Sequence, residues 1–210
     1  MDKKLIITVG RTFGSGGRVL ARMLADRLGI AFYDKRLLLE AARRAGVAPE
    51  YFERNDERLP KFISGVFSFT HGYSPMAWYN DPTSISSDSI YKAQCDYIRH
   101  IATSENCVIV GRTADYVLRD IPGVINIFVH APESECVKRI IERHEALTPE
   151  QARALARRAN KARAAFYNFY TDKTWGQASG YDLTLDSSLL PMSDNVDLME
   201  AYIRARLDRE

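Results

Sequence analysis

The stretch that decides the fold is KLIITVGRTFGSGGRVLARMLADRLG, residues 4–29. It opens with KLIITV, a short continuous apolar run that is typical of a strand buried on both faces of a sheet. From Gly16 onward the apolar residues recur at helical spacing, and Gly29 supplies a helix stop. A glycine-rich loop, residues 10–18, joins the two elements.

The same alternation of buried strands and amphipathic helices continues along the chain. It predicts a parallel α/β sheet with helices on both faces, within one domain that spans residues 1–210. Two segments fit this pattern poorly, 45–90 and 145–180, and long insertions of this kind commonly serve as lids or binding loops. Further strands are predicted at 30–33, 107–110, 124–129 and 181–185, and helices at 35–44, 84–103, 133–144, 149–170 and 194–208.

Composition excludes several classes of protein. Lys and Arg number 29 and Asp and Glu 27, and this net charge of +2 argues against a broadly basic nucleic-acid binder. No run approaches the roughly 18 apolar residues that a membrane span needs. The three cysteines are widely separated and no pair of histidines has metal-ligand spacing, so we expect neither a disulfide framework nor a protein-held metal. We therefore expect a cytoplasmic protein without membrane or nucleic-acid partners.

The glycine-rich loop has the features of an anion site. Glycines let backbone N–H groups point at an anion, and the following helix adds the positive end of its dipole. The loop departs from the GxxxxGK[ST] pattern because Gly17 stands where the lysine is expected, and Arg18 is the nearest cation. The alternative is a tight turn that holds no ligand. The predicted phosphate-binding residues are Gly14, Ser15, Gly16, Gly17 and Arg18.

Charged residues follow two other predicted strands. Asp34 ends the second strand, where a dinucleotide-binding fold places the acid that holds a ribose. Arg112 and Asp115 follow the strand at 107–110, at the sheet edge where open α/β sheets bind ligands. Arg112 is a candidate phosphate clamp, and Asp115 is a candidate to orient metal-bound water. The alternative for these residues is a helix cap with a surface ion pair.

The second poorly fitting segment is rich in arginine. Phosphoryl transfer depends on positioning and positive charge more than on a covalent residue. Arg157, Arg158 and Arg163 are therefore candidates to close over a transferring phosphate, the alternative being an ordinary solvated helix face. By their spacing, Asn160, Arg163 and Tyr167 share one face of the predicted helix.

Three stretches together resemble the cytidylate kinase-like family of P-loop kinases. They are GRTFGSGGRVLARMLADRLGIAFYDKRLL, CVIVGRTADYVL and ARRANKARAAFYNFYTDKTWGQASGYDLTLDSS. The resemblance implies a P-loop NTPase-type sheet, ATP at the loop, an acceptor-binding insertion at 35–90 and an arginine-rich lid at 145–180. The residues that match family motifs are Gly14, Ser15 and Gly16 of the loop, Asp34, Gly111 and Arg112, and the lid arginines Arg157 or Arg158 with Arg163.

The chain also departs from the motifs of authentic cytidylate kinases. The aspartate that follows their GR motif is Thr113 here, and Asp115 is the nearest acid. Their acceptor-phosphate arginine falls on Glu40, and their lid acid falls on Asn160.

We expect Mg²⁺-ATP-dependent phosphoryl transfer to a small acceptor, which the resemblance implies is a nucleoside monophosphate. Two alternatives remain open: a nucleotide sensor that has kept the fold without turnover, and a dinucleotide-binding module with Asp34 on the ribose. In the sensor, Gly17→Lys is expected to restore activity. The aromatic residues at 62–81 are typical of a loop anchor or a subunit contact, which leaves a homodimer open.

Overall fold

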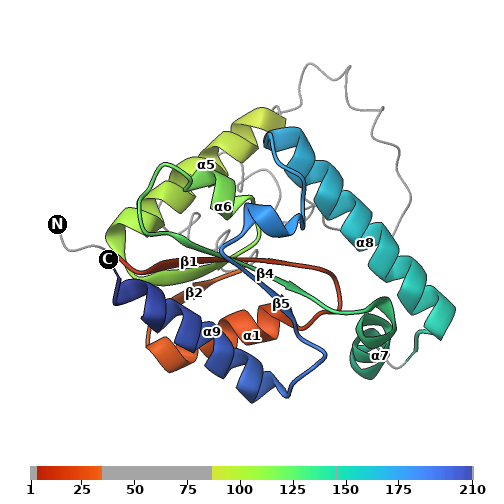
Figure 1. Ribbon diagram of the computed structural model, residues 1–210. Helices are drawn as coiled ribbons and strands as arrows, with labels where there is room; N and C mark the ends of the chain where they lie inside the picture. Colours follow the sequence, from red (N-terminus) through yellow and green to blue (C-terminus); the bar gives the residue numbers. More distant parts are fainter. Residues whose placement is uncertain (1–3, 35–86, 145, 210) are drawn as a thin grey trace.

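A five-stranded parallel sheet forms the centre of the protein. The computed structural model describes residues 4–34, 87–144 and 146–209 (Figure 1). β1 lies in the middle of the sheet and pairs with β3 on one side and β4 on the other. The order across the sheet is β2 (Ala31–Tyr33), β3 (Cys107–Val110), β1 (Ile6–Arg11), β4 (Ile125–His130) and β5 (Leu183–Asp186).

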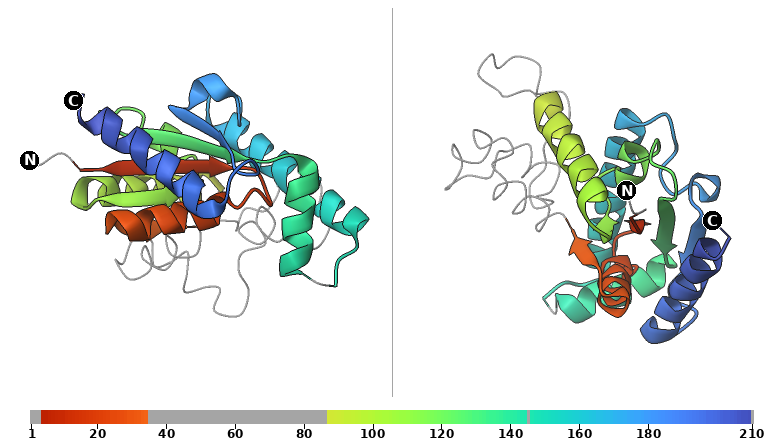
Figure 2. Two further views of the ribbon diagram at one scale, coloured as in Figure 1. Left: turned by 60° about the horizontal axis from the view of Figure 1, so that its bottom comes forward. Right: turned by 90° about the vertical axis from the view of Figure 1, so that its left-hand side faces the viewer.

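Helices cover both faces of the sheet, which confirms the predicted fold class. α1 (Gly17–Leu28) and α9 (Met192–Leu207) lie on one face, and α5 (Ser87–Ser104) with the short α6 (Ala114–Val117) lies on the other (Figures 1 and 2). A 3₁₀ turn at Ala178–Gly180 precedes β5. α7 (Glu133–Arg143) packs against α8 (Pro149–Tyr170), and Thr148 caps α8 with a capping box.

The sheet separates two apolar cores. The first packs between the sheet and α1 with α9, and its buried side chains include Leu24, Ile127 and Met199. The second packs between the sheet and α5 with α6, around Ile98 and Leu118. Because both faces of β3 are buried, its sequence CVIV is continuously apolar rather than alternating.

Most predicted boundaries agree with the structure to within three residues, and the loop starts two residues later than predicted. Gly10 and Arg11 were assigned to the loop, but they continue β1 and pair with Phe128 and Val129 of β4. Thr12 N–H then donates to Val129 O at 3.0 Å, and the chain leaves the sheet only after that bond. Arg11 is therefore held by the sheet ladder rather than by a loop.

The strand order is wrong for the dinucleotide-binding alternative. In that fold the first two strands are adjacent, so the acid after the second strand lies beside the glycine loop after the first. Here β3 lies between β1 and β2. Asp34 is instead ion-paired to Arg18.

Several predictions fall outside the described residues. They are the helix at 35–44, the aromatic segment 62–81 and nearly all of the predicted insertion at 35–90. Among the residues that the structure does describe, no helix is both long and apolar enough to cross a membrane.

We expect the stability of the protein to depend strongly on the side chains that β4 contributes to the first core. Ile127 is fully buried there, so Ile127→Ala is expected to lower the free energy of unfolding by about 2–5 kcal/mol through lost burial and a residual cavity. Leu198 on α9 is 48% exposed, and Leu198→Ala is the matched control, expected to stay within about 0.5 kcal/mol. Urea unfolding measures both, and equal losses would contradict this packing.

Candidate functional site

The glycine loop, residues 12–18, joins β1 to α1 at the carboxyl edge of the sheet. Gly14 and Gly16 have left-handed backbone angles, with φ of 84° and 79°. A Cβ at Gly14 would lie 2.8 Å from Cβ of Cys136, so the loop passes too close to α7 for any side chain there. Among the described residues, the N–H groups of Gly14 and Gly16 donate no hydrogen bond. They remain available to an anion at the start of α1.

Hydrogen bonds from Arg139 and Ser187 hold the backbone of the glycine loop in place. Arg139 of α7 donates from Nη1 to the Ser15 carbonyl oxygen at 2.8 Å and from Nη2 to the Ser187 carbonyl oxygen at 2.9 Å. The Ser187 hydroxyl also donates to the Ser15 carbonyl oxygen at 2.5 Å. Ser15 itself is fully buried, and its hydroxyl donates to the Thr12 carbonyl oxygen. The loop is therefore tied to α7 and to the end of β5 before any ligand binds.

Arg18 forms an ion pair with Asp34. Its Nε lies 2.7 Å and its Nη2 2.5 Å from Oδ2 of Asp34. The Arg18 side chain is 65% exposed whereas that of Asp34 is 7% exposed. The structure thus joins two predicted site residues, one from the loop and one from the end of β2.

An unusual turn after β3 positions Arg112. Gly111, Arg112 and Thr113 all have positive φ, at 73°, 63° and 52°, a conformation that costs energy in residues other than glycine. The Thr113 hydroxyl lies 2.8 Å from the hydroxyl of Tyr91 on α5. Arg112 donates from Nη1 to Oε1 of Gln94 at 2.8 Å. Burial, with Arg11 close by, lowers the pKa of the Arg112 guanidinium to about 9.

Asp115 lies in the first turn of α6 and is bound by α8. The hydroxyl of Tyr167 donates to Oδ2 of Asp115 at 2.6 Å, and both side chains are buried. Burial raises the pKa of the Asp115 carboxyl, and the bond from Tyr167 opposes this rise in part. This pair connects the β3 edge to the predicted lid.

The face of α8 predicted from spacing does meet the glycine loop. Asn160 accepts a hydrogen bond from Phe13 N–H at 2.7 Å, and Arg163 donates from Nη1 to the Arg11 carbonyl oxygen at 3.0 Å. The Arg163 guanidinium also lies 5.4 Å from the centre of the Phe13 ring. Burial lowers the pKa of the Arg163 guanidinium to about 9, and the positive charge of Arg11 contributes a smaller part of this decrease.

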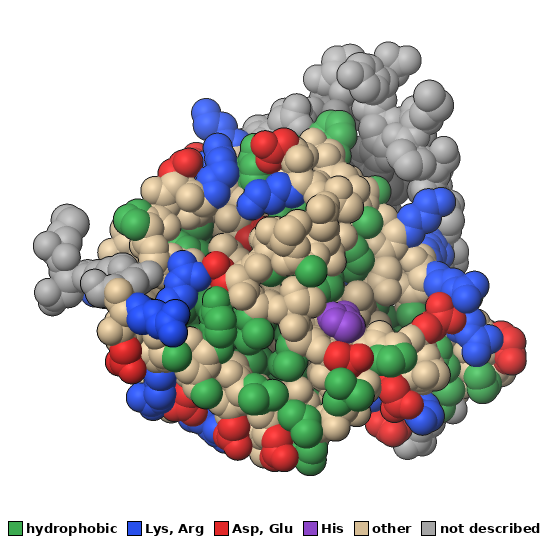
Figure 3. All heavy atoms as spheres, in the orientation of Figure 1, with side chains coloured by type: hydrophobic (Ala, Val, Ile, Leu, Met, Phe, Trp, Pro, Cys, Tyr) green, Lys and Arg blue, Asp and Glu red, His purple; other side chains and the backbone are tan. Residues whose placement is uncertain are grey.

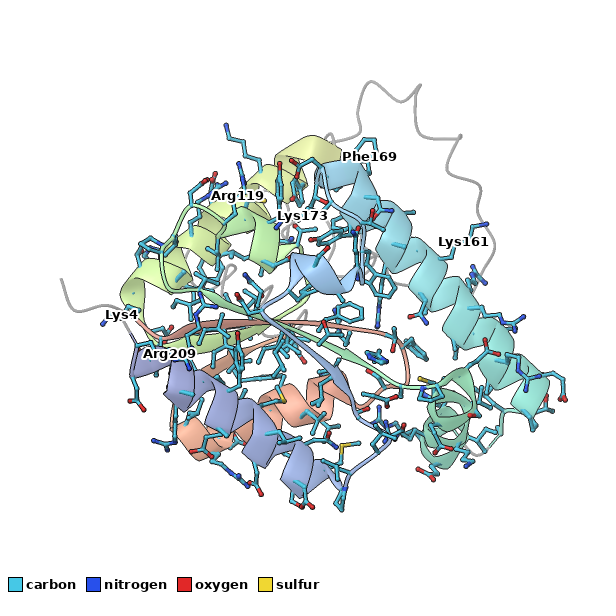
Figure 4. All side chains as sticks on the ribbon, in the orientation of Figure 1. Lys4, Arg119, Lys161, Phe169, Lys173 and Arg209 are labelled. Carbon is cyan, nitrogen blue, oxygen red and sulfur yellow. The ribbon has the colours of Figure 1, made fainter. Side chains whose placement is uncertain are left out.

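The other predicted lid arginines lie on different faces of α8. Arg157 binds the carboxylate of Glu133 on α7, with Nε 2.9 Å from Oε2 and Nη2 3.1 Å from Oε1. Arg153 reaches the same carboxylate, and Arg158 is exposed. Figure 3 shows basic and acidic side chains interspersed where α7 and α8 meet, and Lys161 points outward from α8 (Figure 4). These charges connect α7 to α8 or face solvent, so a phosphate contact by Arg157 or Arg158 stays a prediction.

Two neighbouring cavities open on this edge. The loop cavity, about 150 Å³, is bounded by the glycine loop and by Arg143, His144 and Arg163. The aromatic cavity, about 260 Å³, lies under α8 and between the ends of β1 and β3. Arg11, Phe13 and Arg163 line both. The aromatic cavity is otherwise lined chiefly by Arg112, Asp115, Phe166, Tyr167, Trp175 and Tyr181.

The structure brings together most of the predicted site and adds residues that the sequence analysis missed. Arg18 and Arg163 line the loop cavity, and Arg112, Asp115 and Arg163 line the aromatic cavity. The missed residues are Arg11, Arg139 and Ser187. Only Arg11 had a sequence signal, because it is a second cation beside a loop that lacks its lysine.

Fold and site together define a P-loop kinase-type α/β protein. The model of the cytidylate kinase-like family matches residues 6–189, so the chain belongs to this family, as its motifs suggested. A cytidylate kinase of Methanosarcina acetivorans is 24% identical to the chain over 204 residues, covering 97% of this chain and 99% of that protein.

Solved structures agree on the fold. An uncharacterized protein from Eubacterium ventriosum superposes with a TM-score of 0.71 at 27% identity, covering 96% of this chain and 99% of that one. A gluconokinase from Sinorhizobium meliloti gives 0.56 at 17% identity, covering 99% and 95% of the two chains. A shikimate kinase from Bacteroides thetaiotaomicron gives 0.54 at 12% identity, covering 95% and 98%. Family and fold support a nucleotide-dependent phosphotransferase.

The buried carboxyl of Asp115 predicts a pH effect on stability. Its pKa in the folded protein is raised above 3.8, so between these two values the unfolded chain has released a proton that the folded chain still holds. Rising pH therefore destabilises the fold through this window, by about 1.4 kcal/mol per unit of pKa difference. Asp115→Asn keeps an acceptor for Tyr167 and does not titrate.

We expect Asp115→Asn to gain stability relative to the natural chain as the pH rises from about 4 to about 7. Urea unfolding at a series of pH values measures this difference. Asp120→Asn is the control, since it makes the same chemical change at a side chain that is 82% exposed. A pH-independent difference for Asp115→Asn would contradict the assignment.

Proposed function

We propose that the protein is an ATP-dependent phosphotransferase whose acceptor is a nucleoside monophosphate. The observation that carries this proposal is the pair of adjoining cavities that share Arg11, Phe13 and Arg163. One cavity lies over a loop with available N–H groups, and the other combines arginines with aromatic rings. A phosphoryl group moving between two substrates needs such a shared, positively charged boundary.

On the donor side, the phosphates of ATP bind over Gly14, Ser15, Gly16, Gly17 and Arg18. The N–H groups of Gly14 and Gly16 and the start of α1 supply donors and a favourable dipole. No acidic residue lies in the first turn of α1 to repel the phosphates. Arg143 and Arg163 face the loop across its cavity and add positive charge.

On the acceptor side, the aromatic cavity takes the nucleoside monophosphate. Phe166, Tyr167, Trp175 and Tyr181 offer ring surfaces on which a base can stack. Arg112 is half-buried at the strained turn, and its planar guanidinium suits a phosphate. Asp115 offers a carboxyl to hydrogen-bond donors of the base or sugar, while Asp34 acts through its pair with Arg18.

Transfer takes place beside Arg163. An oxygen of the acceptor phosphate attacks the terminal phosphorus of ATP, the bond to the bridging oxygen breaks, and ADP leaves. Arg163 is held by the Arg11 carbonyl and by Phe13, so it stabilises developing charge without having to reorganise. Arg157 and Arg158 would join it only after leaving their present positions on the outer faces of α8.

Mg²⁺ would enter with the nucleotide. The described residues include no cluster of three or more histidine, cysteine or acidic side chains, and the loop has Arg18 and Val19 near the place of the usual hydroxyl. These residues do not fit a protein-held metal site. The phosphate oxygens of ATP would carry the ion, and the roles assigned above are those of the protein's own side chains.

A phosphotransfer panel tests the proposal. The purified protein is mixed with Mg²⁺-ATP and each common nucleoside monophosphate, and the products are separated by chromatography. We expect turnover with at least one acceptor, and Arg163→Gln should lower kcat by about 10²–10³-fold, as when one preorganised charge donor is removed. Arg99→Gln, an exposed site paired with Asp96 on α5, is the control with unchanged turnover.

The outcomes separate the alternatives. ATP binding without transfer to any acceptor would favour the sensor, and absence of both would contradict the proposal. Full activity in Arg163→Gln would show that the shared boundary of the two cavities is not the place of transfer.

A further inference from the structure

The space beside the position of the missing loop lysine is filled by the stem of another basic side chain, that of Arg11. A Cβ at Gly17 would lie 2.7 Å from Cβ of Arg11 and 3.0 Å from Cβ of Val129. The backbone φ of Gly17 is not positive, so conformation does not require glycine at this position. What requires it is the Arg11 side chain, whose stem fills the space that a side chain at Gly17 would need.

A second glycine makes room for the far end of the same side chain. A Cβ at Gly111 would overlap the Arg11 guanidinium. The Arg11 side chain therefore runs from the end of β1, past Gly17 at the start of α1, to Gly111 at the end of β3. Its position is determined along its whole length by two glycines on different elements.

The Arg11 side chain is half-buried, and no described residue accepts a hydrogen bond from its guanidinium. Burial lowers its pKa to about 10, with Asp34 opposing and Arg18 adding to the decrease. Within the described part of the chain it makes no hydrogen bond and no ion pair. Arg11 lines both the loop cavity and the aromatic cavity. A half-buried cation that lines two cavities and has no carboxylate partner is ready to bind an anion.

We propose that Arg11 supplies the fixed positive charge that the loop lacks at Gly17, and that its guanidinium binds the terminal phosphate of the bound nucleoside triphosphate. This inference rests on the proposed function. In the GxxxxGK[ST] pattern a glycine begins the loop and a lysine ends it. Here the order is reversed, with Arg11 at the start of the loop and Gly17 at its end.

Arg11 is better placed than Arg18 to supply this fixed charge, although the sequence pattern favours Arg18. Arg18 is mostly exposed, and two of its nitrogens lie on the carboxylate of Asp34. Arg11 is less exposed than Arg18, is positioned by β1 and lies on the boundary that both substrates share. Its planar fork offers two parallel donors that match two oxygens of one phosphate, a geometry that the compact ammonium of a lysine lacks.

Arg11→Met tests the charge while keeping an unbranched stem between the two glycines. We expect kcat for phosphotransfer to fall by about 10²–10³-fold, with the acceptor KM within about threefold, because the lost contact is to the transferring group. Thermal unfolding establishes that the variant folds. Arg99→Gln again serves as the matched arginine control.

An exchange of the two positions gives the sharper test. Gly17→Lys alone should be inactive, because its Cβ meets the Arg11 Cβ. Arg11→Gly alone should lose activity, and Arg11→Gly with Gly17→Lys should regain at least about tenfold over it, since the cation returns to the same space. Guanidinium ion added to Arg11→Gly should also raise its turnover.

Failure of this inference differs from failure of the proposed function. If the natural chain neither binds Mg²⁺-ATP nor transfers phosphate, the proposed function and this inference both fall. If the natural chain is active and Arg11→Met matches it, only the inference is overturned. Loss of activity that neither Gly17→Lys nor guanidinium ion restores would assign Arg11 a structural role and overturn the inference as well.

Discussion

The crowding of positive charge at one edge of the sheet is the constraint on which the rest of the site depends. The side chains of Arg11, Arg112 and Arg163 are half-buried around one cavity, and desolvation lowers the pKa of each guanidinium. Arg11 further lowers the pKa of the other two. Such a cluster loses hydration and repels itself, and a bound polyanion relieves both costs. The mutual repulsion of these guanidinium groups thus favours the binding of phosphate.

Several features of the fold keep these charges in place. The pairing of β1 with β4 extends as far as Arg11, the strained turn at Gly111 to Thr113 positions Arg112, and one face of α8 presents Arg163. Behind the glycine loop, Arg139 and Ser187 bind the Ser15 carbonyl oxygen. The two apolar cores stabilise the sheet that carries these elements.

The fold was predictable from the sequence because buried parallel strands and amphipathic helices leave clear patterns. β3 is found at the predicted 107–110 and α8 at the predicted 149–170. The strand order was not predictable, since the pattern does not record which strands pair. It took the position of β3 between β1 and β2 to exclude the dinucleotide-binding fold.

The candidate site was predictable where a local pattern carries the chemistry, as in the glycine loop and the shared face of Asn160, Arg163 and Tyr167. It was not predictable where tertiary contacts select one arginine among many. Arg157 and Arg163 lie on different faces of the same helix: Arg163 faces the loop, whereas Arg157 binds Glu133 of α7. The partnership of Arg11 with Gly17 and Gly111 joins three elements, and no spacing in the sequence indicates it.

A crystal structure with a non-hydrolysable ATP analogue and a nucleoside monophosphate would test most directly whether Arg11 and Arg163 bind the terminal phosphate. We expect the β and γ phosphates over Gly14 and Gly16, with the terminal phosphate within hydrogen-bond distance of the Arg11 and Arg163 guanidinium groups. We also expect the monophosphate beneath α8, against Trp175 and Tyr181. A nucleotide bound elsewhere, or a terminal phosphate held only by Arg18, would contradict it.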